Sequence, residues 1–169
     1  MVDVFVERQG VSPWTGHGEP DAVPVAGCDL HKAHWQGSYV AEAGPRICHY
    51  RAPDAESVRL AFRAIGISVD AIWAGTVHGS ISPSADYAVV SLRFEPPLPV
   101  DAAGAVAIAQ SEWLTPVGLR LAQAFVSTTH GRVICLCERP DGDSYRLTPS
   151  GNAPGEGRVW SCRSMTVAS

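Results

Sequence analysis

The stretch that decides the fold of this chain is present twice. Residues 47–60 read Ile-Cys-His-Tyr-Arg-Ala-Pro-Asp-Ala-Glu-Ser-Val-Arg-Leu, and residues 134–147 read Ile-Cys-Leu-Cys-Glu-Arg-Pro-Asp-Gly-Asp-Ser-Tyr-Arg-Leu. The two segments lie 87 positions apart and share seven of fourteen residues, and Ile72-Trp73 returns at the same spacing as Val159-Trp160. Because similarity at a fixed period is typical of repeated structure, the sequence indicates an internal duplication.

Both halves show the same alternation of predicted elements. In the first half, apolar alternation predicts strands over 2–7, 35–41, 46–51 and 70–76. Asp54 can cap a helix that ends at Gly66, whereas Gly and Pro predict a loop over 8–20 and only a weak turn near 29–31. The second half predicts a helix over 102–113, a short second helix near Pro149, and strands over 87–94, 119–128, 132–138 and 158–165.

The order strand, helix, strand, strand, helix, strand in each half predicts an α+β protein made of two ferredoxin-like (βαββαβ) repeats. We expect the first repeat over 1–78, a linker over 79–86, and a diverged second repeat over 87–169. A sheet with helices on one face also needs cover on the other. Packing the two half-sheets face to face, as a fused dimeric α/β-barrel, would give that cover and enclose a cavity.

The first half resembles a family of small ferredoxin-like proteins, one member type of which binds nickel and most of which have no assigned function. The resemblance covers residues 1 to about 78 and is carried by two motifs, Trp35-Gln36-Gly37-Ser38-Tyr39-Val40 and Cys48-His49-Tyr50-Arg51-Ala52-Pro53-Asp54. The second half matches the family only through Ile134-Cys135, Pro140-Asp141 and Phe125-Val126. The resemblance therefore implies the ferredoxin-like fold and a diverged second copy.

The resemblance also implies a divalent transition metal, nickel, as a cofactor, but this chain departs from the family where the ligands are expected. Family members commonly carry histidines at the positions held here by Gly37 and Ala61. Imidazole and thiolate suit nickel, copper and zinc. The remaining candidates for a metal site are therefore Cys28, His31 and His34, and the alternative is that they are ordinary loop or surface residues.

Polar residues on the third predicted strand are the candidates for catalysis. His49 and Arg51 share one face of that strand, and the repeat places Glu138 at the position that corresponds to Arg51. If this face points into the barrel, a base, a cation and an acid could bind an anionic or enolic ligand and move protons. If it points outward, the same residues form a solvated strand end.

Four further residues are candidates for ligand binding beside His49. Tyr39 and Ser38 offer hydroxyl groups from the second strand, whichever of its faces is the inner one, and Trp73 and Trp160 are related by the repeat. The alternative for the two tryptophans is packing in the core, where an indole is more often found than at a ligand site. Cys48 and Cys135 are also repeat mates, for which buried packing is the simpler interpretation.

Composition excludes several partners and compartments. The net charge is -4 without a run of basic residues, which argues against nucleic acid and anionic membranes as partners. No apolar run reaches the length of a spanning helix, and the N-terminus lacks a signal-peptide pattern. Five cysteines without a CxxC pair fit reduced thiols, so we expect a cytoplasmic protein.

These observations leave three hypotheses for function. The first is a small-ligand-binding protein with a cavity between two half-sheets, in which the ligand is an organic molecule or nickel. The alternative is an enzyme, a cofactor-independent isomerase, cyclase or monooxygenase on the same scaffold, an analogy that rests on fold alone. The third is a structural module without a ligand. A homodimer is left open, and no catalytic motif chooses between the three.

Overall fold

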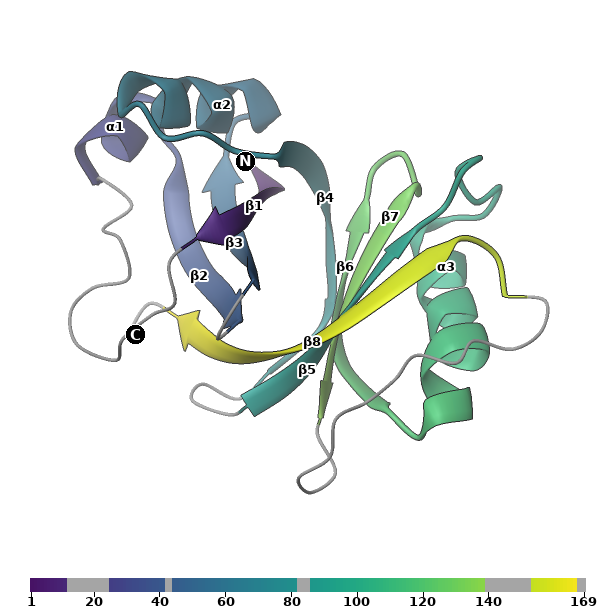
Figure 1. The fold of residues 1–169 in the computed structure, drawn as a ribbon. Helices are drawn as coiled ribbons and strands as arrows, with labels where there is room; N and C mark the ends of the chain where they lie inside the picture. Colours follow the sequence, from purple (N-terminus) through teal and green to yellow (C-terminus); the bar gives the residue numbers. More distant parts are fainter. Residues whose placement is uncertain (12–24, 42–43, 82–85, 139–152, 167–169) are drawn as a thin grey trace. The chain divides into compact units, whose positions relative to one another are not determined.

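The computed structural model describes residues 1–11, 25–41, 44–81, 86–138 and 153–166. These residues form a mixed α/β fold with eight strands and few helices, and the strand pairs within each unit, such as β1–β3 and β5–β7, are antiparallel (Figure 1). The chain divides into two compact units, the first made of residues 1–75 and 163–169 and the second of residues 76–162. No helix in the described ranges is long and apolar enough to span a membrane.

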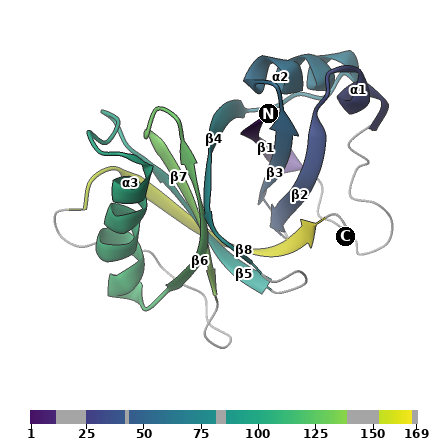
Figure 2. The ribbon, with the colours of Figure 1, turned by 180° about the vertical axis from the view of Figure 1, so that it is seen from behind.

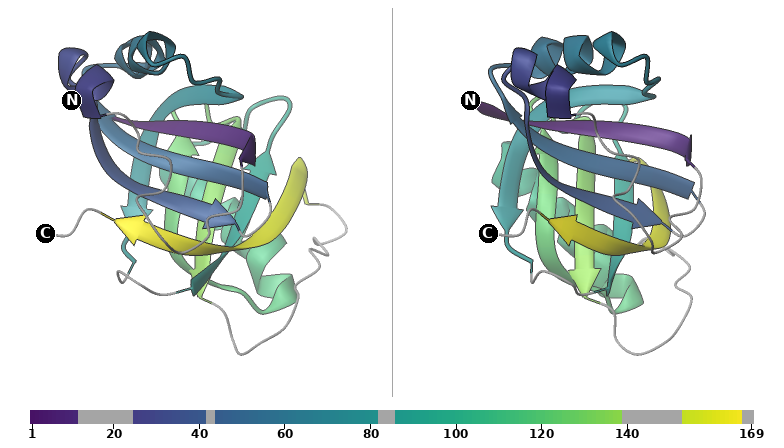
Figure 3. Two further views of the ribbon diagram at one scale, coloured as in Figure 1. Left: turned by 60° about the vertical axis from the view of Figure 1, so that its left-hand side comes forward. Right: turned by 90° about the vertical axis from the view of Figure 1, so that its left-hand side faces the viewer.

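The first unit contains two helices and four strands in the order β-α-β-β-α-β. Its elements are β1 (Val2–Val11), α1 (Val25–Leu30), β2 (His34–Ala41), β3 (Gly44–Ala52), α2 (Ala55–Ala64) and β4 (Ala71–Gly79), whose last four residues belong to the second unit. The strands are ordered β4-β1-β3-β2. Both helices lie on the same side of these strands (Figure 3).

The second unit has the same strand order with different helices. Its elements are β5 (Asp86–Arg93), α3 (Ala102–Ile108), a π-helical turn (Ala109–Leu114), a 3-10 turn (Thr115–Val117), β6 (Arg120–Ser127), β7 (Arg132–Glu138) and β8 (Glu156–Thr166). The strands are ordered β8-β5-β7-β6, and α3 lies along one face of them (Figure 2). The short helix predicted near Pro149 lies outside the described residues.

The two hairpins share an irregularity at corresponding positions. In the first, the pairing of β2 with β3 shifts between Trp35 and Gly37, opposite Tyr50 and His49. In the second, the pairing of β6 with β7 shifts between 121 and 123, opposite 137 and 136, which are the repeat mates of Tyr50 and His49. An extra residue inserted in one strand bends and twists a hairpin locally. The two units therefore bend their hairpins at the same place.

Each unit has its own core on the helix-covered face of its strands. In the first, α2 buries Val58, Ala61 and Phe62 against the sheet. The helix begins where predicted, because the Asp54 carboxylate accepts a hydrogen bond from the Ser57 backbone N–H at 2.7 Å. The sheet contributes alternate residues to this core, among them Val4, Val6, Cys48, Tyr50 and Ala52.

The core of the second unit has the corresponding composition. Strand residues Ala88, Val90, Leu92, Ala124, Val126, Val133, Cys135 and Cys137 pack there with helical Ala105, Ala109, Trp113 and Leu114. All five cysteines are buried and are reduced thiols, as the odd count without a CxxC pair predicted. Burial raises the pKa of Cys48 and Cys135, so these thiols are packing residues and not activated nucleophiles.

Several predicted boundaries were wrong. Residues 8–11 continue β1 where a loop was predicted, because Arg8 and Val11 pair with β3 across a second irregularity. Strand β4 also runs on to Gly79, whose positive φ of 80° and close approach to the Ala122 carbonyl suit only glycine. The helix predicted over 102–113 becomes π-helical after Ile108, and α1 begins four residues before the predicted turn. The predicted fused dimeric α/β-barrel depends on how the two units are placed relative to each other, and it remains a prediction.

Candidate functional site

The site is built on the helix-free face of the first sheet. Cys48 and Tyr50 belong to the helix-side core, so strand alternation directs their neighbours His49 and Arg51 to the opposite face. Register adds β1 residues to that face, because Asp3 is paired with Arg51 and Phe5 with His49. His49 and Arg51 of the first unit therefore point away from the helices.

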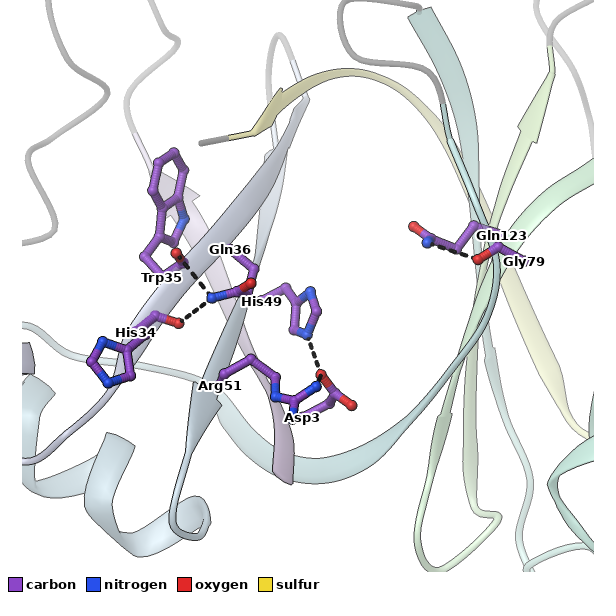
Figure 4. A network of polar contacts seen from close by, with 8 residues as sticks. All are labelled: Asp3, His34, Trp35, Gln36, His49, Arg51, Gly79 and Gln123. Carbon is purple, nitrogen blue, oxygen red and sulfur yellow. Dashed lines mark hydrogen bonds and ion pairs between the residues drawn. The ribbon is translucent and has the colours of Figure 1, made fainter. Parts of the chain in front are cut away.

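Three of these side chains form a polar cluster, which we call the Asp3 cluster: Asp3, His49 and Arg51. The His49 Nε2 atom lies 2.8 Å from Asp3 Oδ1, and Arg51 Nη1 lies 3.8 Å from the same oxygen (Figure 4). Exposure of the side chains falls from 48% at Arg51 through 22% at Asp3 to 14% at His49. The arginine is thus the accessible end of the cluster and the imidazole its sheltered end.

The protonation of His49 depends on two opposing effects. Burial lowers the pKa of His49, and the nearby Arg51 cation acts in the same direction, whereas the hydrogen bond and negative charge of Asp3 oppose them. Burial is the largest of these effects. The lowered pKa favours the neutral imidazole, and a neutral imidazole can accept a proton from a ligand.

A row of rings continues from His49 across the next two strands. The Phe5 ring stacks on His49 at a centroid distance of 4.9 Å and on Trp73 at 4.5 Å. The Trp73 indole N–H donates to Glu7 Oε1 at 2.8 Å, and Glu7 is only 7% exposed. The row orients the imidazole from one side, while Asp3 orients it through a hydrogen bond.

Glu138 does not belong to the Asp3 cluster. It forms an ion pair with Arg120 in the second unit, and 47% of its side chain is exposed. The acid beside His49 is instead Asp3, which sequence analysis missed. The available signal was the alternation at the N-terminus, which places Asp3, Phe5 and Glu7 together on one face of β1.

The predicted ligand residues Ser38 and Tyr39 lie on opposite faces. The Ser38 hydroxyl donates to Cys48 Sγ at 3.1 Å and accepts from Trp35 Nε1 at 3.0 Å, so it serves the helix-side core. Tyr39 is paired with Ile47 and is 4% exposed on the face that carries His49. Of the two hydroxyls, only that of Tyr39 shares a face with the Asp3 cluster.

The two repeat-related tryptophans differ in their hydrogen bonds. Trp73 has the Glu7 carboxylate as acceptor, whereas the buried Nε1 atom of Trp160 has no hydrogen-bond partner among the residues that the structure describes. Leaving a buried N–H unpaired costs roughly 1–3 kcal/mol. The Trp160 indole therefore lacks the stabilising hydrogen bond that the Trp73 indole has.

The predicted metal ligands do not form a metal site. Cys28 is buried in the helix-side core, whereas His34 is exposed at the start of β2. Across the described part of the chain, no three His, Cys, Asp or Glu side chains group as a metal site would require. Gly37 and Ala61 also lie on different faces, since Gly37 is paired with His49 and Ala61 packs in the core. The donor set that the structure describes does not fit a nickel ion.

One other polar side chain near this face was not predicted. Gln36 is the extra residue of the irregular β2–β3 hairpin, and its amide nitrogen donates to the His34 and Trp35 carbonyls (Figure 4). In the second unit, Gln123 follows the corresponding irregularity, and its amide donates to the Gly79 carbonyl at 3.2 Å. These amides satisfy backbone carbonyls at sites where regular strand pairing is interrupted.

Comparison with known proteins finds a family resemblance over part of the chain. No curated protein and no solved structure matches it. Residues 22–74, from just before α1 to near the middle of β4, match the family model described as "Nickel responsive protein SCO4226-like". The resemblance seen in the two first-half motifs is thereby confirmed for this segment, which contains His49 and Arg51 but neither Asp3 nor any residue of β5 to β8.

Proposed function

We propose that the first unit binds a small organic molecule, anionic or enolic, at the Asp3 cluster. The observation that carries this proposal is the 2.8 Å contact between Asp3 and His49 on a sheet face that no described helix covers. Asp3 and Arg51 offset each other in charge, and burial lowers the pKa of His49, which favours the neutral imidazole. The cluster is therefore suited to a ligand that shares a proton with the imidazole and directs an anionic group at the arginine.

The gradient of exposure supports this orientation of the ligand. Arg51 is the accessible group and would contact the anionic end first, whereas His49 and the fully buried Phe5 lie deeper. The proposal concerns the first unit alone and does not depend on how the two units are arranged.

The test is a binding screen with matched arginine variants. Small carboxylates and enolisable ketones are screened against the full chain by thermal shift, and hits are titrated calorimetrically. Arg51→Gln should weaken binding of an anionic hit by about tenfold or more, as expected for a charged hydrogen bond of about 1.5–3 kcal/mol.

Arg59→Gln is the matched control. Arg59 is also an arginine of the first unit, 38% exposed and ion-paired, but with Glu56 on α2. Its replacement should leave binding unchanged. Equal loss in both variants would count against the Asp3 cluster as the site.

A second function, proton transfer in an isomerase or cyclase, is favoured by the hydrogen bond that orients His49. A base held by a carboxylate is the arrangement that general-base catalysis uses. The test is exchange of α-protons for deuterium in the bound ketones, followed by NMR. We expect His49→Gln to abolish exchange, whereas Arg59→Gln should not affect it; exchange that persists in His49→Gln would exclude this role.

Nickel binding is the function that the family description suggests, and the described residues do not supply a site for it. Metal analysis of the purified chain with and without chelator tests this directly. Stoichiometric nickel that resists mild chelation would show that ligands outside the described residues complete a site.

We also propose that the two units descend from one ferredoxin-like repeat. The equivalent strand orders and the shared hairpin irregularity support this origin, as does the spacing of 87 between corresponding β3 and β7 residues. Its test is a circular permutant that begins at residue 87. If the units are separable copies, the permutant should fold to the native circular dichroism spectrum.

A further inference from the structure

The starting point is the ring nitrogen through which His49 contacts Asp3. His49 Nε2 lies 2.8 Å from Asp3 Oδ1, and Arg51 Nη1 lies 3.8 Å from the same oxygen (Figure 4). A guanidinium has donors only, and an ionised carboxylate has acceptors only. The Asp3 oxygen therefore offers lone pairs to both neighbours, and the proton of its hydrogen bond with His49 is carried by Nε2.

This hydrogen bond distinguishes the two tautomers of the imidazole. A neutral imidazole carries one ring proton, so a proton on Nε2 leaves Nδ1 as an acceptor. In water the two tautomers exchange, because water can donate to either nitrogen or accept from it. In the first unit, a proton on Nδ1 would instead leave two acceptors, His49 Nε2 and Asp3 Oδ1, facing each other at 2.8 Å.

The surroundings of the hydrogen bond strengthen this preference. Phe5 stacks on the imidazole at a centroid distance of 4.9 Å and an angle of 16° between the rings, which holds the plane of the imidazole. The side chains of His49 and Asp3 are only 14% and 22% exposed. Hydrogen bonds to charged groups are strong, and more so where water is partly excluded. Asp3 is therefore placed to determine which nitrogen of His49 accepts.

We propose that Asp3 is a positioning residue, whose carboxylate holds His49 in the tautomer with the proton on Nε2. Nδ1 is then the accepting atom of the imidazole, and any group that contacts it must donate a hydrogen bond. The ligand of the Asp3 cluster is accordingly a 2-hydroxycarboxylate, whose hydroxyl donates to Nδ1 while its carboxylate pairs with Arg51. The tautomer follows from the contact alone, whereas this choice of ligand rests on the proposed function.

A simple carboxylate fits the same groups less well. Both of its oxygens are acceptors, so they can pair with the Arg51 guanidinium but not with Nδ1 of His49. A hydroxyl on the neighbouring carbon supplies the donor. Arg51 is 48% exposed and His49 is 14% exposed, so the carboxylate would stay near solvent and the hydroxyl would be directed inward.

The first experiment measures the tautomer directly, without a ligand. Proton–nitrogen correlation spectra of the isotope-labelled full chain are recorded at about pH 8.5, above the ordinary pKa of histidine, and His49→Gln assigns the resonances of His49. A single tautomer gives each ring nitrogen its limiting chemical shift, whereas exchange between tautomers averages the two. We expect limiting values with the proton on Nε2. Averaged values, or a proton on Nδ1, would overturn the role of Asp3.

Asp3→Asn is the decisive variant, because an amide can donate to Nε2 as well as accept from it. It should move both nitrogen resonances of His49 toward averaged values. Arg51→Gln is the matched control, since it removes the neighbouring charge but not the contact between Asp3 and His49, and it should keep the limiting values. An equal change in both variants would mean that charge, and not the hydrogen bond, fixes the tautomer. Should Asp3→Asn fail to fold, the spectra of the unmodified chain and of Arg51→Gln decide the question.

The second experiment tests the ligand with sodium lactate and sodium propanoate, which differ by one hydroxyl. We expect lactate to bind about two- to tenfold more tightly, as one hydrogen bond between uncharged groups provides, and to shift the Nδ1 resonance of His49. Propanoate should leave that resonance in place. Equal affinities and equal shifts would overturn the choice of ligand. If neither salt binds while the tautomer is the expected one, the proposed function fails and the role of Asp3 stands.

Discussion

The helix-free faces of the two units differ far more than their helix-covered faces. On the helix side, Cys48 corresponds to Cys135 and both are buried in a core. On the other side, Phe5 and His49 of the first unit correspond to Val89 and Leu136 of the second, as the strand pairs show. The polar positions differ as well, since Asp3, Glu7 and Arg51 correspond to Tyr87, Ser91 and Glu138.

The difference between the two kinds of face shows which positions are constrained by packing against a helix and which are not. Each helix-covered face must pack against a helix, so its residues are mainly apolar in both units. The other face has no described helix to fit. There one unit carries a base, an acid and a cation, while the other carries Val89 and Leu136 in place of the rings and an indole N–H without an acceptor among the described residues. The helix-free faces are therefore the ones on which the two units can differ in function.

The largest loss of stability is expected at Phe5, an aromatic residue whose counterpart in the second unit is Val89. Phe5→Ala removes a fully buried ring that stacks on both His49 and Trp73. We expect the free energy of unfolding to fall by about 3–5 kcal/mol, measured by urea denaturation. Val89→Ala at the corresponding position should cost less, because it removes only two methyl groups. If Phe5→Ala lowers the free energy of unfolding no more than Val89→Ala does, the stacked rings do not stabilise the first unit beyond what the aliphatic side chains do in the second.

A smaller loss of stability is expected when the Trp73 indole loses its acceptor, as the Trp160 indole has none among the described residues. Glu7→Ala removes the acceptor of the Trp73 indole and leaves a buried N–H unpaired, at a cost of about 1–3 kcal/mol in the free energy of unfolding. Glu7→Gln keeps a carbonyl acceptor and should cost less. If both variants are as stable as the unmodified chain, the hydrogen bond between Glu7 and Trp73 does not contribute to the free energy of unfolding. The two indoles would then not differ in how they stabilise their units.

Loss of the N-terminal helix cap should destabilise both units to a similar extent, and by less than the two substitutions above. The Asp101 carboxylate accepts from the Gly104 backbone N–H at 2.8 Å, as Asp54 does from Ser57. Asp101→Ala should lower the free energy of unfolding by about 0.5–2 kcal/mol, while Asp101→Ser should retain most of it. Asp54→Ala should act in the same direction in the first unit. A loss in one unit only would show that the two helices depend on their caps to different extents.

The elements were predictable from sequence where a local signal fixes them. Strand alternation gave β2, β3 and β7 almost to the residue, and Asp54 gave the start of α2. The extensions of β1 and β4 were missed because Gly10 and Gly79 suggest breaks. Their pairing with distant strands outweighs that local preference.

The candidate site was predictable only in part, because cross-strand contacts depend on register. His49 and Arg51 follow from one strand, whose alternation places them together. Asp3 joins them only because β1 is paired with β3 in one register, and a shift by one residue would turn Asp3 to the other face. Trp160 was predicted from the repeat, but Ser91, which corresponds to Glu7 by register, lies outside the repeated motif, so the difference between the two indoles could not be predicted.

The smallest expected effect is a pH dependence that only the first unit can show. In the folded chain, burial lowers the pKa of His49 below its ordinary value of 6.5. Between the lowered value and 6.5 the unfolded chain binds more protons than the folded chain, so the free energy of unfolding decreases as the pH falls through this range. Below the lowered pKa the loss levels off, and above 6.5 it is absent.

His49→Gln should remove this dependence, so that the stability of the unmodified chain falls more steeply than that of the variant as the pH decreases from 7. Urea denaturation at a series of pH values measures it. The control is His34→Gln, which replaces an exposed histidine of the neighbouring strand and should leave the profile unchanged. The second unit has Leu136 at the corresponding position and contributes no such term. A steeper fall in the His49→Gln variant would mean that Asp3 outweighs burial and holds the imidazole protonated, which would reverse the role assigned to His49 as a proton acceptor.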